Sequence, residues 1–265
     1  MYMKNGLDEL ALYFSLKYRG DFQKIYDALI NKEKIDEDLK SKLINKLKCK
    51  YVTIFSDNYP EMLKLINCPP FVLYYYGNLN LLNNEITVLT GSYNPDDYGM
   101  QVTEKIAFDL IENNHTIVNG MATGIEKYAL ETAIKAQGNC IAVLGCGINN
   151  CYPKENRLLY EELKQNHLVL SEYPDNVLPS KVNLLFRNRI VAGLSGGAIV
   201  TESNMENGIM TTLGYELEQG KDIFAVPTSI LNEKNGTNAL IENGAIPYLG
   251  IESIEFSEKN KTLEL

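Results

Sequence analysis

The stretch Cys140-Ile141-Ala142-Val143-Leu144, ended by the turn Gly145-Cys146-Gly147, decides the fold of this 265-residue chain. A short apolar run that stops at glycines is typical of a strand buried on both faces of a sheet. From residue 51 onward such runs alternate with amphipathic segments, which indicates strand–helix units on a parallel sheet. The predicted strands are residues 71–76, 86–89, 116–118, 140–144, 168–170, 198–201 and 223–226.

Helical spacing predicts four helices between these strands, over residues 98–112, 124–136, 154–165 and 208–218. Residues 1–50 carry three short helical patterns instead, and Asp21 is a suitable N-cap for the second of them. We therefore predict two domains: a small helical domain over residues 1–50 and an α/β domain over residues 51–265.

The bulk composition excludes several classes of protein. A net charge of −9 argues against a protein that holds duplex DNA by overall electrostatics, so any nucleic-acid site must be local. No apolar run reaches the roughly 18 residues of a membrane span, and the N-terminus lacks the apolar region of a signal peptide. Five cysteines without CxxC pairs predict reduced thiols in the cytoplasm and no metal site.

Small and polar residues follow most of the predicted strands. In a parallel sheet these turns share the carboxyl edge, where such folds bind ligands. Glycines there let backbone N–H groups face an anion. His115 and His167 precede strands and so fall at the opposite edge, which argues against a histidine base or metal ligand. The turns are residues 90–92, 119–124, 145–147, 171–173, 202–204 and 227–229.

Two of the chain's four arginines, Arg187 and Arg189, flank Asn188. A guanidinium fork meets two phosphate oxygens at once, so we interpret this pair as a phosphate-binding element. Aromatic faces with a few cations are what single-stranded nucleic acid requires, and a nucleotide site would use the same groups. Other candidates at this edge are Lys154 and Lys181 as cations, Asn119 and Asn207 as amides, and Tyr93, Tyr152 and Tyr173 as stacking rings.

Recognisable catalytic motifs are missing. The turn at Gly145 lacks the third glycine of a dinucleotide fingerprint, and no GxxxxGK[ST] sequence occurs. Glu172 and Glu202 end strands and are able to act as bases, but no second catalytic group accompanies them. Such carboxylates more often orient an arginine or cap a helix. The prediction is an anion-binding protein with no catalytic residue and no cofactor.

At these residues the sequence resembles the DNA-processing protein A family (DprA/Smf) over almost its full length. The motifs that carry the resemblance are Tyr59-Pro60-Glu61-Met62-Leu63, Gly91-Ser92, Gly120-Met121-Ala122-Thr123-Gly124-Ile125, Tyr152-Pro153-Lys154-Glu155-Asn156, Ser171-Glu172-Tyr173-Pro174, Arg187-Asn188-Arg189-Ile190-Val191-Ala192-Gly193-Leu194-Ser195 and Asp222-Ile223-Phe224-Ala225-Val226-Pro227.

The resemblance implies an extended Rossmann-like domain with helices on both faces of a mostly parallel sheet, after a helical (SAM-like) N-terminal domain. It also implies a cytoplasmic homodimer with no enzymatic activity, which binds single-stranded DNA without sequence preference and loads the RecA recombinase during natural transformation. The DNA-binding residues implied are Gly91, Ser92, Tyr93, Gly120, Gly124, Lys154, Lys181, Arg187, Asn188, Arg189, Asn207 and Gly208.

Three departures from the family pattern predict weaker DNA binding. Tyr93 stands where the family has the arginine of Gly-Ser-Arg, Glu126 stands for an aspartate, and Asn207-Gly208-Ile209 stands for Ser-Gly-Ser. Two other functions remain open on the same residues. One is an enzyme of the phosphoribohydrolase type that acts on nucleoside monophosphates, although its Pro-Gly-Gly-x-Gly-Thr loop is not present. The other is a sensor of a nucleotide ligand.

Overall fold

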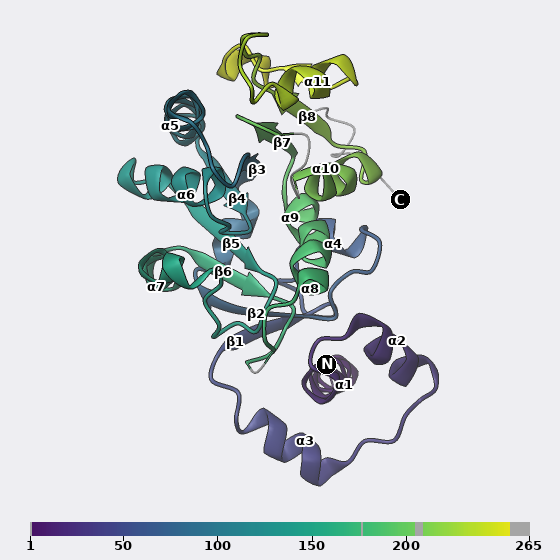
Figure 1. Cartoon of the computed structure of the whole chain (residues 1–265). Helices are drawn as coiled ribbons and strands as arrows, with labels where there is room; N and C mark the ends of the chain where they lie inside the picture. Colours follow the sequence, from purple (N-terminus) through teal and green to yellow (C-terminus); the bar gives the residue numbers. More distant parts are fainter. Residues whose placement is uncertain (1, 176, 205–208, 255–265) are drawn as a thin grey trace.

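The computed structural model describes residues 2–175, 177–204 and 209–254. Three helices form the N-terminal part, α1 (Tyr2–Tyr18), α2 (Phe22–Ile30) and α3 (Glu37–Ile44), and they lie together at one end of the molecule (Figure 1). The Asp21 side chain accepts a hydrogen bond from the Lys24 backbone N–H, so the predicted N-cap of the second helix is confirmed. Tyr13, Phe14, Ile25 and Ala28 form a separate small core between these helices.

The rest of the chain is built on one nine-stranded sheet, in the order β1-β2-β6-β5-β4-β3-β7-β8-β9. All pairings from β6 to β9 are parallel, which confirms the predicted α/β class. Two antiparallel strands, β1 and β2, extend the sheet beyond β6, and this reversal was not predicted. The strands are β1 (Lys50–Thr53), β2 (Val72–Gly77), β3 (Glu85–Thr90), β4 (His115–Asn119), β5 (Cys140–Leu144), β6 (Leu168–Ser171), β7 (Gly197–Val200), β8 (Asp222–Ala225) and β9 (Ile246–Pro247).

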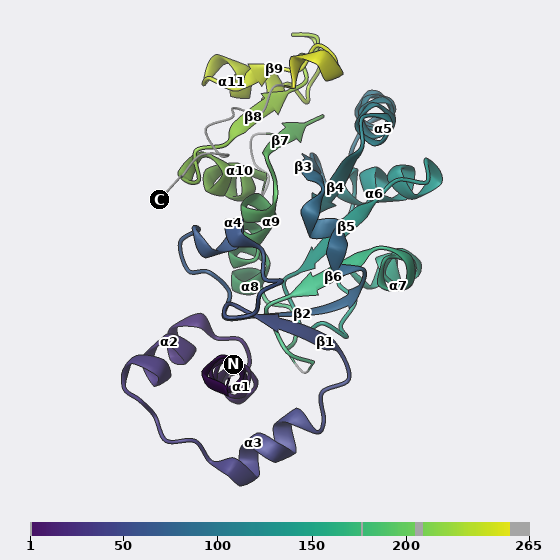
Figure 2. The same cartoon turned by 180° about the vertical axis from the view of Figure 1, so that it is seen from behind.

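Helices cover both faces of the sheet. Figure 1, and the reverse view in Figure 2, show α5 (Asp97–Glu112), α6 (Ile125–Lys135) and α7 (Arg157–Asn166) over one face. The other face carries the short helices α4 (Glu61–Lys64), α8 (Lys181–Phe186) and α9 (Asn188–Leu194), then α10 (Ile209–Glu218) and α11 (Gly236–Glu242).

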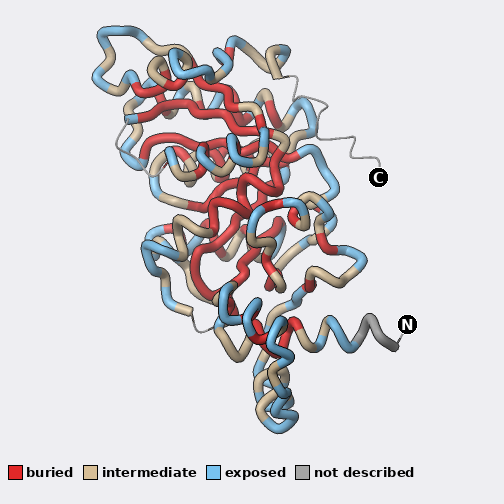
Figure 3. The backbone as a smooth tube through the Cα atoms, turned by 90° about the vertical axis from the view of Figure 1, so that its right-hand side faces the viewer, coloured by how far each residue is buried: buried red, intermediate tan, exposed pale blue. Residues whose placement is uncertain are grey.

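Each face of the sheet has its own apolar core, and together they form the buried centre in Figure 3. All five residues of β5 are buried, as a strand covered on both sides requires.

The N-terminal helices pack directly on the sheet domain. The turn between α1 and α2 lies so close to the end of β6 that a side chain at Gly20 would overlap the backbone of Glu172 and Tyr173. Gly20 also has φ of +75°, a conformation that favours glycine. The Phe22 ring stacks on Phe71 with ring centroids 5.2 Å apart.

The two histidines lie at the edge away from the strand-to-helix turns, as predicted. His115 is the first residue of β4, and His167 directly precedes β6. Burial lowers the pKa of both imidazoles, so both are neutral at pH 7. Among the residues described, we find no helix whose length and apolar character would let it cross a membrane.

Candidate functional site

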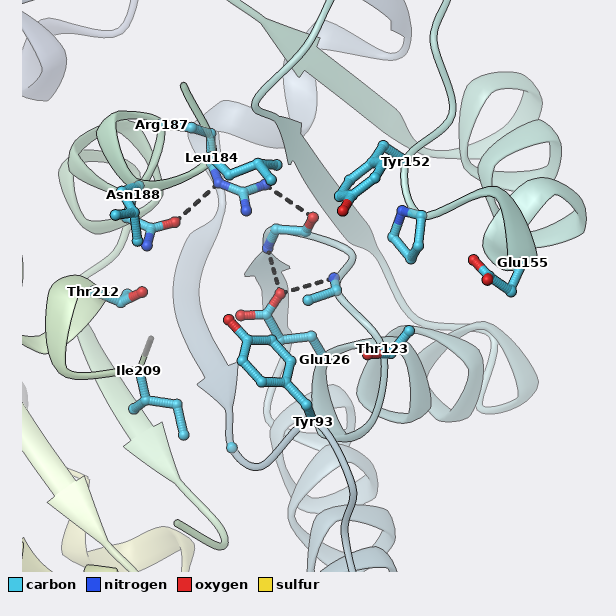
Figure 4. A pocket seen from close by; sticks show the side chains of 15 residues that line it. Tyr93, Thr123, Glu126, Tyr152, Glu155, Leu184, Arg187, Asn188, Ile209 and Thr212 are labelled. Atoms are coloured by element: carbon cyan, nitrogen blue, oxygen red, sulfur yellow. Dashed lines mark hydrogen bonds between the residues drawn. The ribbon is translucent and has the colours of Figure 1, made fainter. Parts of the chain in front are cut away.

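A pocket of about 300 Å³ opens at the carboxyl ends of β3, β4 and β5, next to the point where the strand order changes from β3 to β7 (Figure 4). This is the place where open α/β sheets bind ligands. Helices α8, α9 and α10 close its other side. The lining residues are Gly91, Tyr93, Gly120, Ala122, Thr123, Glu126, Tyr152, Pro153, Glu155, Leu184, Leu185, Arg187, Asn188, Ile209 and Thr212.

Arg187 stands at the junction of α8 and α9, and its guanidinium forms one wall of the pocket. Its Nε donates to Asn188 Oδ1 at 2.9 Å, and its Nη1 donates to the carbonyls of Gly120, at 2.9 Å, and Val143. The remaining nitrogen, Nη2, has no hydrogen-bond partner among the described residues and points into the pocket in Figure 4. Burial lowers the pKa of Arg187, but arginine titrates so far above neutrality that the charge persists.

Gly120 is required for this arrangement. A side chain at this position would overlap the Arg187 guanidinium, because the guanidinium lies directly on the Gly120 backbone. The glycine in the turn after β4 therefore serves the close approach of an arginine, where the sequence had predicted the close approach of an anion.

Glu126 occupies the backbone donors of that same turn. Its Oε2 accepts from the N–H groups of Gly120, at 3.1 Å, and Ala122, at 3.0 Å, and its Oε1 accepts from the Thr90 hydroxyl at 3.0 Å. The N–H of Met121 is bonded to the Asn119 side chain. The turn that the sequence predicted as an anion cradle thus already holds an anion, the carboxylate of the chain itself.

Two tyrosines flank the pocket. Tyr93 follows β3 and Tyr152 follows β5, and both rings are partly exposed at the opening. Burial, and then the neighbouring Glu126 carboxylate, raise the pKa of Tyr93, so its hydroxyl stays protonated at neutral pH. Leu184 and Leu185 of α8 supply apolar surface. These groups suit a flat aromatic ligand with polar edges.

Arg189 does not belong to this pocket, which corrects the sequence interpretation of a paired arginine fork. The side chain is 2% exposed, and its two terminal nitrogens bind the Glu172 carboxylate at 2.7 and 2.6 Å. The Nε donates to the Cys68 carbonyl and the guanidinium covers the Phe186 ring. The Arg189 side chain therefore donates its hydrogen bonds to groups of the protein itself and stabilises the fold.

The other predicted residues divide into groups. Gly91, Tyr93, Gly120, Arg187 and Asn188 line the pocket together. Ser92 and Gly124 lie behind the lining, and Ser92 Oγ has no hydrogen-bond partner among the described residues. Lys154 is exposed between two lining residues, Pro153 and Glu155, and Lys181 is exposed at the first turn of α8. Asn207 and Gly208 fall outside the described residues.

The remaining polar candidates are structural. Glu172 holds Arg189, and Glu202 accepts from the Asp96 N–H before α5 and from Lys234. Tyr173 and Asn119 are buried away from the pocket. Within the described part of the chain, no three histidine, cysteine or carboxylate side chains gather as metal ligands would. Its five cysteines are unpaired.

Sequence reasoning missed two contributions to the pocket. Glu126 was noted only as a departure from a family pattern, although an acidic residue in the first turn of α6, directly after a glycine turn, is placed to accept backbone N–H groups. Helix α8 was not predicted, and its Leu184 and Leu185 carried no periodic signal in so short a segment.

Comparison with known proteins gives consistent matches. Residues 50–257 match the family described as DNA recombination-mediator protein A. DNA processing protein DprA of Bacillus subtilis (strain 168) is 36% identical over 213 residues, which are 79% of this chain and 72% of the relative. DNA processing protein DprA of Streptococcus pneumoniae is 40% identical over 194 residues, which are 73% of this chain and 68% of the relative.

Solved structures agree. The X-ray structure of DNA processing protein A from Streptococcus pneumoniae matches with a TM-score of 0.74 and 32% identity, covering 94% of this chain and 92% of the other. DNA processing protein A from Helicobacter pylori, whose structure concerns its single-stranded DNA binding mode, matches with a TM-score of 0.70 and 32% identity over 77% of this chain and 93% of the other. The chain therefore belongs to the DNA recombination-mediator protein A family, the DprA/Smf family that its sequence resembles.

Proposed function

We propose that this chain binds single-stranded DNA without sequence preference and helps to load the RecA recombinase in natural transformation or another recombination pathway. It acts as a homodimer in the cytoplasm, without catalysis and without a cofactor. The observation that carries the proposal is the Arg187 guanidinium, which faces a pocket flanked by Tyr93 and Tyr152 in a chain of this family. The single-stranded DNA binding mode of the Helicobacter pylori relative supports it.

The charges of the pocket decide which part of the strand enters. Arg187 is the one cation among the lining residues that the structure describes, whereas Glu126 and Glu155 are both acidic. A phosphate placed about 4 Å from the Glu126 carboxylate would meet a repulsion of about 1–4 kcal/mol, depending on local screening. A neutral nucleobase avoids this cost, stacks on the tyrosines and leaves its phosphates at the rim.

The rim then supplies the phosphate contacts. Lys154, exposed between two lining residues, and Lys181, exposed at the first turn of α8, give about two phosphate contacts outside the pocket. For single strands this predicts a slope of about −1.4 when log affinity is plotted against log salt. Such a slope is shallow, in keeping with a chain of net charge −9 that has Tyr93 in place of an arginine.

Fluorescence anisotropy with a labelled oligothymidylate at several salt concentrations tests the proposal. Arg187→Ala should lower affinity at least tenfold, because it removes a pocket wall and a positive charge. Arg157→Ala is the matched control, since Arg157 is an exposed arginine on α7 paired with Glu161. Equal affinities for the two variants would show that the strand does not use this pocket.

The RecA and dimer parts of the proposal need separate measurements. The chain should stimulate assembly of RecA filaments on single-stranded DNA that carries single-strand-binding protein, and Arg187→Ala should lose this effect together with DNA binding. Light scattering of the free protein should give twice the mass of one chain. A monomeric mass at all concentrations tested would refute the proposed homodimer, and no effect on RecA filaments would refute the proposed role in RecA loading.

The size of the pocket keeps two alternative functions open. A volume of about 300 Å³ is at the lower end of small-molecule pockets and holds a single nucleotide. If the protein is a nucleotide sensor or a phosphoribohydrolase, mononucleotides should bind more tightly than oligonucleotides in calorimetric titrations. In the enzymatic case, free base should also be released from nucleoside monophosphates. Tight oligonucleotide binding without base release excludes both.

A further inference from the structure

We propose that the N-terminal helical part provides a second contact for single-stranded DNA, in a groove that it forms with α8. The inference rests on the proposed function, because it extends the strand held at the Arg187 pocket. The groove has a volume of about 760 Å³ and lies on the far side of α8 from that pocket. We call it the interdomain groove.

The walls of the interdomain groove carry aromatic and apolar side chains from distant parts of the sequence. Tyr18 and Phe22 come from the turn between α1 and α2, and Phe186 and Val182 come from α8. Val182 is 74% exposed, although it lies on a helix beside an apolar cavity. Rings and aliphatic side chains in an open groove offer stacking surfaces to unpaired bases.

The contacts that hold the groove in shape lie outside the Arg187 pocket. Gly20 lies against the backbone of Glu172 and Tyr173, which fixes the α1–α2 turn on the sheet. Arg189 binds the Glu172 carboxylate and the Cys68 carbonyl, and it covers the Phe186 ring. One buried arginine thus joins three segments that border the groove.

The described residues that line the groove carry two cations and one carboxylate, in an acidic protein. Arg19 and Lys24 line it and Lys181 stands at the adjacent end of α8, whereas Asp21 is the acidic residue among the described lining residues. Lys24 and Asp21 pair at 3.1 Å, with the Lys24 side chain 64% exposed. The local balance therefore favours phosphates, while the chain as a whole carries −9.

The groove and the pocket lie on opposite sides of one short helix. Leu184 and Leu185 of α8 line the pocket, and Val182 and Phe186 of the same helix line the groove. A helix with its side chains is about 10–12 Å across, so one extended strand is able to contact both sides of α8. Cations on the rim together with aromatic walls favour nucleic acid over an apolar peptide as the occupant.

Anisotropy with two oligothymidylates, of about 2 and about 16 nucleotides, separates the two contacts. The shorter one reaches only the pocket. The groove variant Lys24→Glu/Val182→Glu should bind the longer oligonucleotide about tenfold more weakly, because two added carboxylates repel its phosphates, and should bind the shorter one as the parent does. The control Lys135→Glu/Leu158→Glu makes the same change of charge at exposed positions on α6 and α7 that line neither site.

Photocrosslinking with thiothymidine gives an independent readout on the unmodified protein. Nucleotides beyond the one in the pocket should crosslink to peptides that contain residues 18–24, none of which lines the pocket. The inference is overturned if the groove and control variants weaken the longer oligonucleotide equally, or if all crosslinks fall outside these peptides. In either case Arg187-dependent binding of the shorter oligonucleotide would leave the proposed function standing. Loss of that binding as well would instead refute both.

Discussion

Substitution of Arg189 by alanine should destabilise the protein strongly while leaving its DNA site in place. The guanidinium is almost fully buried and makes two charge-assisted hydrogen bonds to Glu172, at 2.7 and 2.6 Å. Removing it leaves the Glu172 carboxylate buried without its partner. Breaking a buried pair from one side costs about 3–5 kcal/mol, a large part of the stability of an ordinary domain.

Urea unfolding, followed by circular dichroism, measures this cost. Arg189→Ala should lower the free energy of unfolding by about 3–5 kcal/mol, and Arg189→Lys should recover only part of it because lysine lacks the fork that meets both carboxylate oxygens. The double variant Arg189→Met/Glu172→Met should be more stable than Arg189→Ala, since it leaves no unpaired charge. The exposed Arg157→Ala should change stability by no more than about 0.5 kcal/mol.

The binding assay decides between a structural arginine and a phosphate ligand. The assay is run without urea, at a temperature where Arg189→Met/Glu172→Met is folded. The affinity of this variant for a short oligothymidylate should lie within about twofold of the parent's affinity, whereas Arg187→Ala should bind at least tenfold more weakly than the parent. The reasoning is refuted if Arg189→Ala unfolds like the parent protein and yet fails to bind DNA. Arg189 would then be a phosphate ligand after all.

Three further predictions concern the pocket and the packing behind it. Gly120→Ala should fold but bind oligothymidylate about tenfold more weakly in anisotropy, because the new methyl group displaces the Arg187 guanidinium; unchanged binding would contradict this role. Glu126→Gln should change the affinity for oligothymidylate by no more than about twofold, since a neutral base in the pocket meets no repulsion from this carboxylate; a severalfold gain in affinity would instead indicate that a phosphate enters the pocket. Burial raises the pKa of Glu216 from 4.5 to about 7, so the folded protein holds a proton that the unfolded chain has lost, and stability should fall between about pH 4.5 and 7, by up to about 3 kcal/mol from this group. Urea midpoints at pH 5 and 7 should show this decrease in stability in the parent protein and not in Glu216→Gln. The same decrease in both proteins would mean that another group causes the pH dependence.

The sheet and its helices were predictable because their periodic signals are local. The apolar run of β5 and the N-cap Asp21 identify their elements without reference to partners. The antiparallel pair β1 and β2 was not predictable in the same way, because strand direction depends on a neighbour far along the chain. The division into residues 1–50 and 51–265 stays a prediction.

The candidate site was only partly predictable. Residues two apart on a helix point in different directions, so Arg187 and Arg189 could not both face one pocket once the segment is helical. Which of them faces it depends on the junction between α8 and α9, which the sequence does not reveal. Glu126 bonds to N–H groups of a turn whose shape appears only in the folded chain.

A crystal structure of the protein with a short oligothymidylate tests the central claim most directly. The account predicts one base inside the pocket between Tyr93 and Tyr152, with Arg187 Nη2 within hydrogen-bond distance of it and the phosphates outside, toward Lys154 and Lys181. A strand bound elsewhere on the protein, with the pocket empty, would contradict it.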